Sequence, residues 1–257
     1  MAGDRSSAGD PARTLGLLWR APAQGQPRPG PKRGRSVDDI VATAITLADA
    51  EGLDSLTVRR VAREMQVAPM TLYTCVPGKA ELLDLMLDDV YRRMRHTDTE
   101  GQPWRSRVEA IAHDNRLLCN RHPWAAAVST VRPPLGPGLM AEYERELRAF
   151  DDLGLDDVEM DAALTFVLGF VRTATLAEAQ AEAAKRESDL NDQQWWEINE
   201  PFARPRHGPD RLPHRSARRH RRAGLAHAAA YSPEHACDFG LERVLDGLRT
   251  LIARRGS

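Results

Sequence analysis

Residues 56–79 constrain the fold more than any other stretch, because they predict two short helices joined by a tight turn. Thr57 is a suitable N-cap for the first helix, since its hydroxyl can accept a hydrogen bond from an unpaired helix N–H. Helical spacing then gives this helix one apolar face, made by Val58, Val61, Ala62 and Met65. The pattern breaks at residues 66–68, and Pro69, which is tolerated in a first helical turn, begins the second helix.

The second helix is predicted to expose an unusual set of side chains. Leu72 and Val76 lie four residues apart and are expected to face inward. Met70, Thr71 and Tyr73 are then left on the outside. In a DNA major groove, hydroxyl groups reach phosphates and base edges, and methyl groups meet thymine. The pattern fits a DNA-binding helix-turn-helix motif, but from spacing alone a plain pair of packed helices in an all-α domain fits as well.

A wider set of residues carries a family pattern. The matching segments are Ile40-Val41-Ala42-Thr43-Ala44, residues 50–57, Val61-Ala62, Thr71-Leu72-Tyr73 and Lys79-Ala80-Glu81-Leu82-Leu83. On these segments, residues 36–94 resemble the DNA-binding domain of the tetracycline-repressor (TetR) family of bacterial transcription regulators. Two positions depart from the family pattern. Gln66 stands in the turn where the family often has glycine, which tolerates positive φ best, and Cys75 stands where the family usually has an aromatic residue or a histidine that contacts the phosphate backbone.

The resemblance implies an all-α fold and a regulatory function. It implies a three-helix helix-turn-helix domain over residues 36–95 and a helical effector-binding and dimerisation domain over residues 103–257. It also implies a repressor that binds a palindromic double-stranded operator as a homodimer and is released by a small-molecule effector. An activator, a regulator without a ligand, and an all-α small-molecule-binding or enzymatic protein whose helix-turn-helix is structural are the alternatives.

The expected DNA contacts come from the predicted motif and the start of the next helix. We expect Arg59, Thr71 and Tyr73 to make the main phosphate and base contacts. The residues expected to assist them are Thr57, Pro69, Met70 and Lys79. Lys79 begins a helix, where its positive charge opposes the helix dipole, so an anion is a favourable neighbour. The resemblance makes that anion a DNA phosphate, whereas pairing with Asp84 or plain solvation is the alternative.

Residues 1–35 are rich in Gly, Pro, Ser and Ala and are expected to form a largely disordered arm. An apolar group within the arm has the composition to dock on the folded part: Leu15, Leu17, Leu18 and Trp19. Basic residues directly before the first helix of the motif are Arg28, Lys32, Arg33 and Arg35. An arm of this kind can reach phosphates or the minor groove, and a solvated linker is the alternative.

Beyond residue 103 the sequence remains helical, without the alternating pattern of strands. Helices are expected over residues 104–121, 123–130, 138–151, 156–185, 192–199 and 233–254. The helices at 156–185 and 233–254 are apolar on more than one face, which indicates burial on two sides. They either fill the monomer core or, as the resemblance implies, form a four-helix interface with a partner subunit. The arginine-rich residues 204–222 are a second nucleic-acid contact, the product of a paired frameshift, or part of a disordered loop expected over 203–224.

The effector pocket that the resemblance implies should be apolar with a few polar groups. The residues expected to line it are Trp124, Phe166 and Phe170, with His113 and Arg172 as polar contacts, although each aromatic residue is also a candidate for the core. Tyr143, Glu144 and Glu146 are expected on a solvated helix face.

Composition and motifs exclude several classes. Hydrophobic residues make up 42% and charged residues 28%, as in soluble globular proteins. We find no apolar run long enough for a membrane span, no signal peptide, and only three widely spaced cysteines, so we expect a cytoplasmic protein with no membrane partner. His113 and Cys119 are candidates for a base and nucleophile or for metal ligands, but their spacing does not place them on one helical face. We therefore expect no catalytic residues, no metal, no cofactor and no enzymatic activity.

Overall fold

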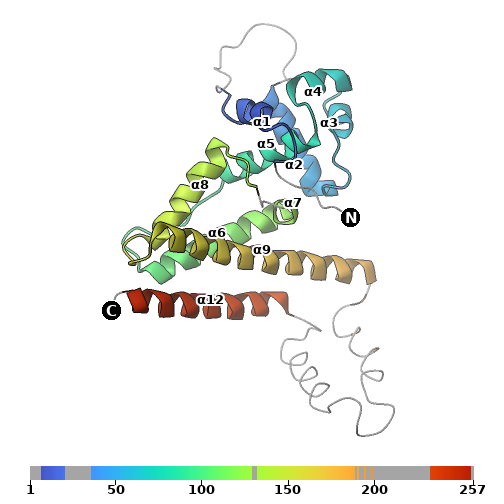
Figure 1. Cartoon of the computed structure of the whole chain (residues 1–257). Coiled ribbons are helices and arrows are strands. Elements are labelled where there is room, and N and C mark those ends of the chain that lie inside the picture. Colours follow the sequence, from blue (N-terminus) through green and yellow to red (C-terminus); the bar gives the residue numbers. More distant parts are fainter. Residues whose placement is uncertain are drawn as a thin grey trace, which may run out of the picture.

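The computed structural model describes residues 7–20, 36–128, 132–188 and 232–255, together with residues 190, 194 and 198. Every regular element in these ranges is helical (Figure 1), which confirms the predicted all-α class. The elements are α1 (Pro11–Leu18), α2 (Val37–Glu51), α3 (Val58–Glu64), α4 (Pro69–Cys75), α5 (Lys79–Arg92), α6 (Trp104–Arg121), α7 (Pro123–Ala127), α8 (Pro137–Leu147), the 3-10 turn η1 (Arg148–Phe150), α9 (Asp157–Ser188) and α12 (Pro233–Arg255). The arginine-rich stretch and most of the helix predicted at 192–199 lie outside the described residues.

Helices α2–α5 form a small bundle with its own core. Helix α2 begins with a capping box, in which the Ser36 hydroxyl accepts the Asp39 N–H at 3.1 Å. It ends at Gly52, whose φ of 77° is one that glycine adopts without strain. The buried side chains of this core include Ile40, Val61, Leu72, Leu82 and Met86. The chain folds this way because each helix carries apolar residues at helical spacing on its inner face.

The α2–α5 core continues into the C-terminal helices. Leu118 and Trp124 are buried in it, although they belong to α6 and α7. Asp49 of α2 reinforces this junction, since its carboxylate accepts the Trp124 Nε1–H at 2.7 Å and lies 2.8 Å from His122 Nδ1. The segment between α5 and α6 is also attached to α6, because the Thr97 N–H donates to Asp114 at 2.8 Å. The two halves of the molecule are therefore joined by buried apolar contacts and by side-chain hydrogen bonds.

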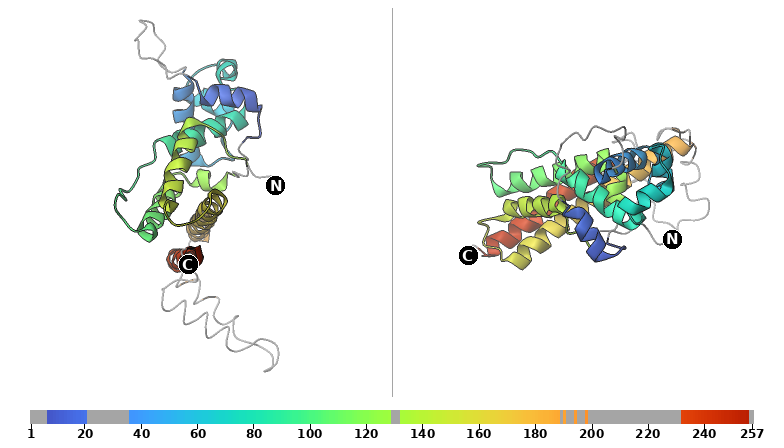
Figure 2. Two further views of the ribbon diagram at one scale, coloured as in Figure 1. Left: turned by 60° about the vertical axis from the view of Figure 1, so that its left-hand side comes forward. Right: turned by 90° about the horizontal axis from the view of Figure 1, so that it is seen from above.

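Helices α9 and α12 form an antiparallel pair on the side of the molecule away from α3 and α4 (Figures 1 and 2). The pair encloses a second core with α6 and η1, made by residues such as Val108, Phe150, Val167 and Leu245. Arg255 at the end of α12 donates from Nε to Glu159 at the start of α9 at 3.1 Å, which fixes the antiparallel register. The Phe170 ring lies over Gly240, where an added Cβ would stand 2.4 Å from the ring, so the two helices approach closely.

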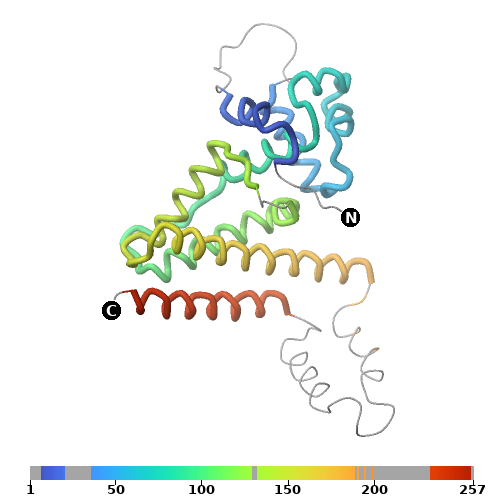
Figure 3. Tube along the Cα trace, in the orientation of Figure 1, coloured from blue at the N-terminus to red at the C-terminus, as the bar shows by residue number. Residues whose placement is uncertain are grey.

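The structure corrects the expectation of disorder for part of the N-terminal arm. Residues 7–20 are placed, and α1 lies against α5 (the path is clearest in Figure 3). Asp10 caps the helix and Pro11 occupies its first turn. Leu18 is buried in the core of the α2–α5 bundle, whereas Trp19 is largely exposed. Leu17 and Leu18 of the apolar group pack on the folded part, whereas Leu15 and Trp19 are exposed. The basic residues expected to contact DNA lie outside the described residues.

Helix α9 passes a membrane-span test of length and composition, contrary to our expectation that no segment would. Its charged groups explain why it belongs to a folded domain instead. Glu159 pairs with Arg255 of α12, and Glu178 pairs with Arg116 of α6 at 2.8 Å. A long core helix packed on several neighbours needs the same apolar composition as a membrane helix.

Candidate nucleic-acid interface and effector site

Helix α4 presents the outward face that the sequence predicted. Leu72 and Val76 are buried, with 2% and 0% of their surfaces exposed. Met70 is 71% exposed and Tyr73 is 38% exposed. The exposed fractions show that Leu72 and Val76 face the core and that Met70 and Tyr73 face outward, where DNA could contact them. Thr71 lies between the two faces and is half-buried.

The turn between α3 and α4 forms without glycine. Gln66 adopts a φ of 54°, in the left-handed region that glycine occupies most easily. Its N–H donates to the Arg63 carbonyl at 3.1 Å, and the Val67 N–H donates to the Ala62 carbonyl at 3.0 Å. This pair of hydrogen bonds is the Schellman arrangement, which satisfies the last carbonyls of α3. The departure at Gln66 therefore leaves the motif intact, at a local cost of about 1–2 kcal/mol.

Two neighbouring arginines of α3, Arg59 and Arg60, differ in their contacts: Arg60 forms ion pairs within the protein, whereas Arg59 is exposed. Arg60 pairs with Glu51 at 2.6 Å and with Glu64 at 2.7 Å, which ties α3 to α2. Arg59 is exposed and makes no ion pair with the described residues, so its guanidinium is available for a phosphate. The Thr57 hydroxyl accepts the Arg60 N–H at 3.0 Å and thereby caps α3 as predicted.

The remaining predicted DNA contacts occupy α4 and the start of α5. Pro69 is exposed at the first turn of α4. Lys79 is half-buried at the start of α5, and its ammonium donates to the Leu53 carbonyl at 2.8 Å. That contact gives Lys79 a structural role in joining α5 to the end of α2, beside any role toward DNA. Cys75 is half-buried at the last residue of α4.

The five predicted effector contacts do not line one site. Phe166 is 59% exposed on the outer side of α9, and His113 is exposed on α6. Trp124 is buried at the junction with α2, and Arg172 donates from Nε to the Ala126 carbonyl at 2.7 Å, at the end of α7. Phe170 packs over α12. Trp124 and Arg172 both fix α7, so the structure gives this pair a role in positioning that helix.

A buried acidic cluster lies inside the C-terminal domain, where the sequence predicted a solvated face. Glu142 and Glu146 of α8 are 4% and 3% exposed. The Asn115 side chain of α6 donates to Glu146 Oε1 at 2.5 Å, and His96 Nε2 lies 3.5 Å from Glu142. The expectation for Glu146 was wrong because α8 packs on α5, α6 and α9 at once, so its polar positions also face neighbours. Amphipathic spacing does not reveal this kind of burial.

The cluster makes the stability of the protein depend on pH. Burial raises the pKa of Glu146 to about 8, against an opposing hydrogen bond from Asn115, and nearby Glu142 raises it further. The folded state therefore holds a proton that the unfolded state releases above its ordinary value near 4.5. Stability is greatest below that value and falls as the pH rises toward 8. Between pH 6 and pH 8 the wild type should lose about 2 kcal/mol of unfolding free energy because Glu146 titrates. Glu146→Gln keeps an acceptor for Asn115 and should not show this loss, as measured by urea unfolding at the two pH values.

The matched control for this prediction is Glu144→Gln, because Glu144 is exposed on the same helix. Its unfolding free energy should follow that of the wild type at both pH values. Equal pH dependence in the wild type and Glu146→Gln would show that Glu146 is ionised in the folded protein.

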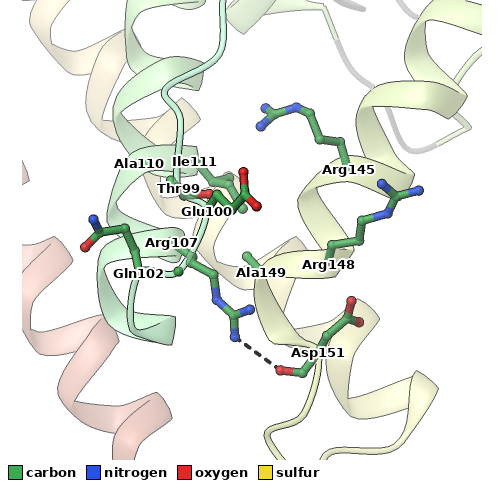
Figure 4. A pocket seen from close by; sticks show the side chains of 11 residues that line it. Thr99, Glu100, Gln102, Arg107, Ala110, Ile111, Arg145, Arg148, Ala149 and Asp151 are labelled. Atoms are coloured by element: carbon green, nitrogen blue, oxygen red, sulfur yellow. Dashed lines mark hydrogen bonds between the residues drawn. The ribbon is translucent and has the colours of Figure 1, made fainter.

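An open hollow of about 440 Å³ lies between the segment at residues 99–102, α6 and the end of α8 (Figure 4). Its apolar surface comes from Ala110, Ile111 and Ala149. Three arginines stand around it: Arg107, Arg145 and Arg148. Arg107 donates from Nη2 to the Asp151 carbonyl at 3.2 Å, while its buried Nε has no hydrogen-bond partner in the described part of the chain. None of the five predicted effector contacts lines this hollow.

The described residues offer weak support for catalysis or metal binding. His113 is exposed, whereas Cys119 on the same helix is buried, and burial raises the pKa of the Cys119 thiol to about 11. A thiol with such a pKa stays protonated at neutral pH and is a poor nucleophile. Within the described residues, no three His, Cys, Asp or Glu side chains are grouped so that they could hold a metal ion.

Comparisons with known proteins agree with this architecture. Residues 97–252 match the family model described as "Tetracyclin repressor-like, C-terminal domain". The HTH-type transcriptional repressor DrrR1 of Streptomyces coeruleorubidus is 38% identical over 253 residues, which span 98% of this chain and 90% of that protein. Apo ActR from Streptomyces coelicolor superposes with a TM-score of 0.68 at 26% identity, over 88% of this chain and 98% of ActR. The complex of ActR with actinorhodin gives a TM-score of 0.64 at 26% identity, over 83% and 94% of the two chains.

Proposed function

The chain belongs to the tetracycline-repressor family, and we propose that it is a repressor that leaves a palindromic operator when a small-molecule effector binds its C-terminal domain. It is a DNA-binding transcriptional regulator and not an enzyme. The observation that supports the proposal best is the outer face of α4, where Met70 and Tyr73 are exposed beside the exposed Arg59 of α3. We place its action in the cytoplasm, where operator DNA lies.

We infer that α9 and α12 form the dimer interface. Val158 and Phe166 of α9 are 77% and 59% exposed, and Phe239 of α12 is 57% exposed. Large apolar side chains gathered on two adjacent helices favour a protein partner over water. A palindromic operator requires a two-fold dimer that presents its two α4 helices to half-sites about one DNA turn, roughly 34 Å, apart. Light scattering should give the mass of a dimer, and Phe166→Glu should lower it to that of a monomer.

The connecting helix α5 supports the proposed mechanism. It completes the core of the α2–α5 bundle, and it also packs along α8 of the C-terminal domain. An effector that binds one arrangement of α6 and α8 more tightly would shift the population toward it. Because α5 touches both parts, that shift changes the spacing of the two recognition helices in a dimer.

We assign the effector to the hollow beside α6 and α8, which has a volume typical of small-molecule sites. Three arginines line the hollow against two acidic residues, Glu100 and Asp151, and Arg145 also pairs with Glu142. The excess of positive charge favours a ligand that carries negative charge, because guanidinium groups bind carboxylates in a fixed geometry. ActR, which has the same fold, forms a complex with the small molecule actinorhodin. A screen for release of operator DNA should therefore return acidic compounds. Arg107→Gln should raise the concentration that such a compound needs.

The direct test of function is a gel-shift titration of the purified protein against the DNA upstream of its own gene. We expect a sequence-selective shift that weakens about tenfold or more between 50 and 200 mM salt, since phosphate contacts release counterions. A scrambled duplex of the same length and composition is the control. Equal affinity for both duplexes, or no shift at low salt, would refute the proposal.

A further inference from the structure

Helix α1 joins two elements that belong to different parts of the molecule. At its start, the Ser7 N–H donates to Asp84 Oδ1 at 2.8 Å, and the Asp10 N–H donates to Glu81 Oε1 at 3.2 Å. Both acceptors lie on α5. At its end, the Trp19 Nε1–H donates to the Leu135 carbonyl at 2.8 Å, two residues before α8. The helix therefore spans the junction between α5 and α8.

The contacts at this junction are buried and closely fitted. Asp84 is 0% exposed and Glu81 is 7% exposed. Leu18 enters the core of the bundle and also packs on Gly136, where an added Cβ would stand 2.8 Å from a Leu18 methyl group. A surface appendage without a role needs no such fit. Burial of two carboxylates under α1 would be unfavourable without the backbone N–H groups that α1 provides.

Carboxylates of α5 accept backbone N–H groups from α8 as well as from residues 7–10. Asp88, one turn beyond Asp84, accepts the Gly138 N–H at 2.8 Å and the Leu139 N–H at 2.9 Å. These N–H groups belong to the first turn of α8, so they have no partner within their own helix. Asp88 thus meets the positive end of the α8 dipole, while Glu81 accepts the N–H of Asp10, the N-cap of α1, and Asp84 accepts the N–H of Ser7, three residues before that cap. Through these three carboxylates, the position of α5 relative to α8 and to α1 is fixed as one unit.

We propose that α1 is a brace (residues 7–20) that holds α5 against α8 in the operator-binding conformer. This inference rests on the proposed function, because it adds a regulatory element to the same mechanism. Any slide of α5 along α8 must break contacts that α1 makes with one of them. The brace therefore stabilises the operator-binding conformer relative to the conformer that leaves the operator. An effector must offset this difference by binding the second conformer more tightly.

The test compares two leucines of α1 in the full-length protein. Leu18 is buried and Leu15 is 40% exposed, so Leu18→Ala should loosen the brace while Leu15→Ala should not. Hydrogen exchange should become faster in α1, α5 and the first turn of α8 of Leu18→Ala, with α9 and α12 unchanged. Operator affinity should fall about five- to tenfold, in the range of ordinary allosteric coupling. Trp19→Ala, which removes the bond to the Leu135 carbonyl and a side chain that is 61% exposed, is the milder second variant if Leu18→Ala folds poorly.

The outcomes separate the brace from the proposed function. Faster exchange in α1 alone, with α5, α8 and operator affinity as in the wild type, would overturn the brace. Identical behaviour of Leu15→Ala and Leu18→Ala would overturn it as well. A wild-type protein that binds no operator would refute the proposed function, while the exchange of α5 and α8 would still decide whether α1 braces them.

Discussion

Replacing Tyr73 with alanine is expected to weaken operator binding by about 100-fold or more and to leave the fold unchanged. Tyr73 stands on the outer face of α4 and is 38% exposed, so its removal opens no cavity in the core. A groove contact contributes about 1–3 kcal/mol, and a dimer loses two of them at once. Since about 1.4 kcal/mol corresponds to a factor of ten, the two losses together give the expected change. Fluorescence anisotropy with labelled operator measures it.

Thr74→Ala provides the matched control for Tyr73→Ala. Thr74 is exposed on the same helix, but its hydroxyl donates to the Thr71 carbonyl at 2.7 Å and is not an expected DNA contact. Its operator affinity should stay within about threefold of the wild type, because no expected DNA contact is lost. The fold should also be kept, since an exposed substitution of this kind changes stability by about 0.5 kcal/mol or less. Tyr73→Phe separates the ring from the hydroxyl. Full operator affinity in Tyr73→Ala would remove Tyr73 from the interface.

The sequence predicted the helices well where strong local signals mark their ends. The helix expected at 104–121 is observed as α6 with those bounds, because Pro103 precedes its start and Pro123 follows its end. The turn at Gln66 was also predicted from the motif. Its φ of 54° shows that the turn keeps the left-handed conformation with glutamine in place of glycine.

Burial by several neighbours could not be predicted from periodicity. Glu142 and Glu146 look like a polar face in the sequence, yet Glu146 meets Asn115 of α6 across a domain interior. Helix α1 has only eight residues, which is too short to persist alone in water. Its order depends on Leu18 and on acceptors more than 70 residues away in the sequence, so local composition indicated disorder.

The five predicted effector contacts are dispersed in the structure for a different reason. Aromatic residues in a helical domain predict burial or an interface, but they do not say which cavity they face. Phe166 and Trp124 were chosen by type, and Phe166 is exposed on α9 whereas Trp124 is buried at the junction with α2. The arginines around the hollow gave no sequence signal, since they come from α6 and from the end of α8 at ordinary surface spacing.

Replacing Gly138 with alanine is expected to have the largest effect on stability, about 2–4 kcal/mol. An added Cβ would stand 2.3 Å from the Asp88 backbone carbonyl oxygen and 2.7 Å from Arg92 Cβ, so a rigid part of α5 blocks it. Overpacking of this kind costs about 1–3 kcal/mol. Separation of α8 from α5 also breaks the two hydrogen bonds to the Asp88 carboxylate, which cost about 1 kcal/mol as a lost cap. Thermal unfolding should show a fall in Tm of roughly 10 °C.

Gly16→Ala is the control, because an added Cβ there meets nothing within 4 Å and the residue is exposed in α1. It should raise stability by about 0.5–1 kcal/mol, since alanine is the better helix former. The contrast isolates the close approach of α8 to α5 from the general effect of glycine in a helix. A Gly138→Ala protein as stable as the wild type would mean that α8 can move away from α5 at little cost. The joint that transmits an effector signal to α5 would then have to lie elsewhere, at the α7–α2 junction held by Asp49 and Trp124.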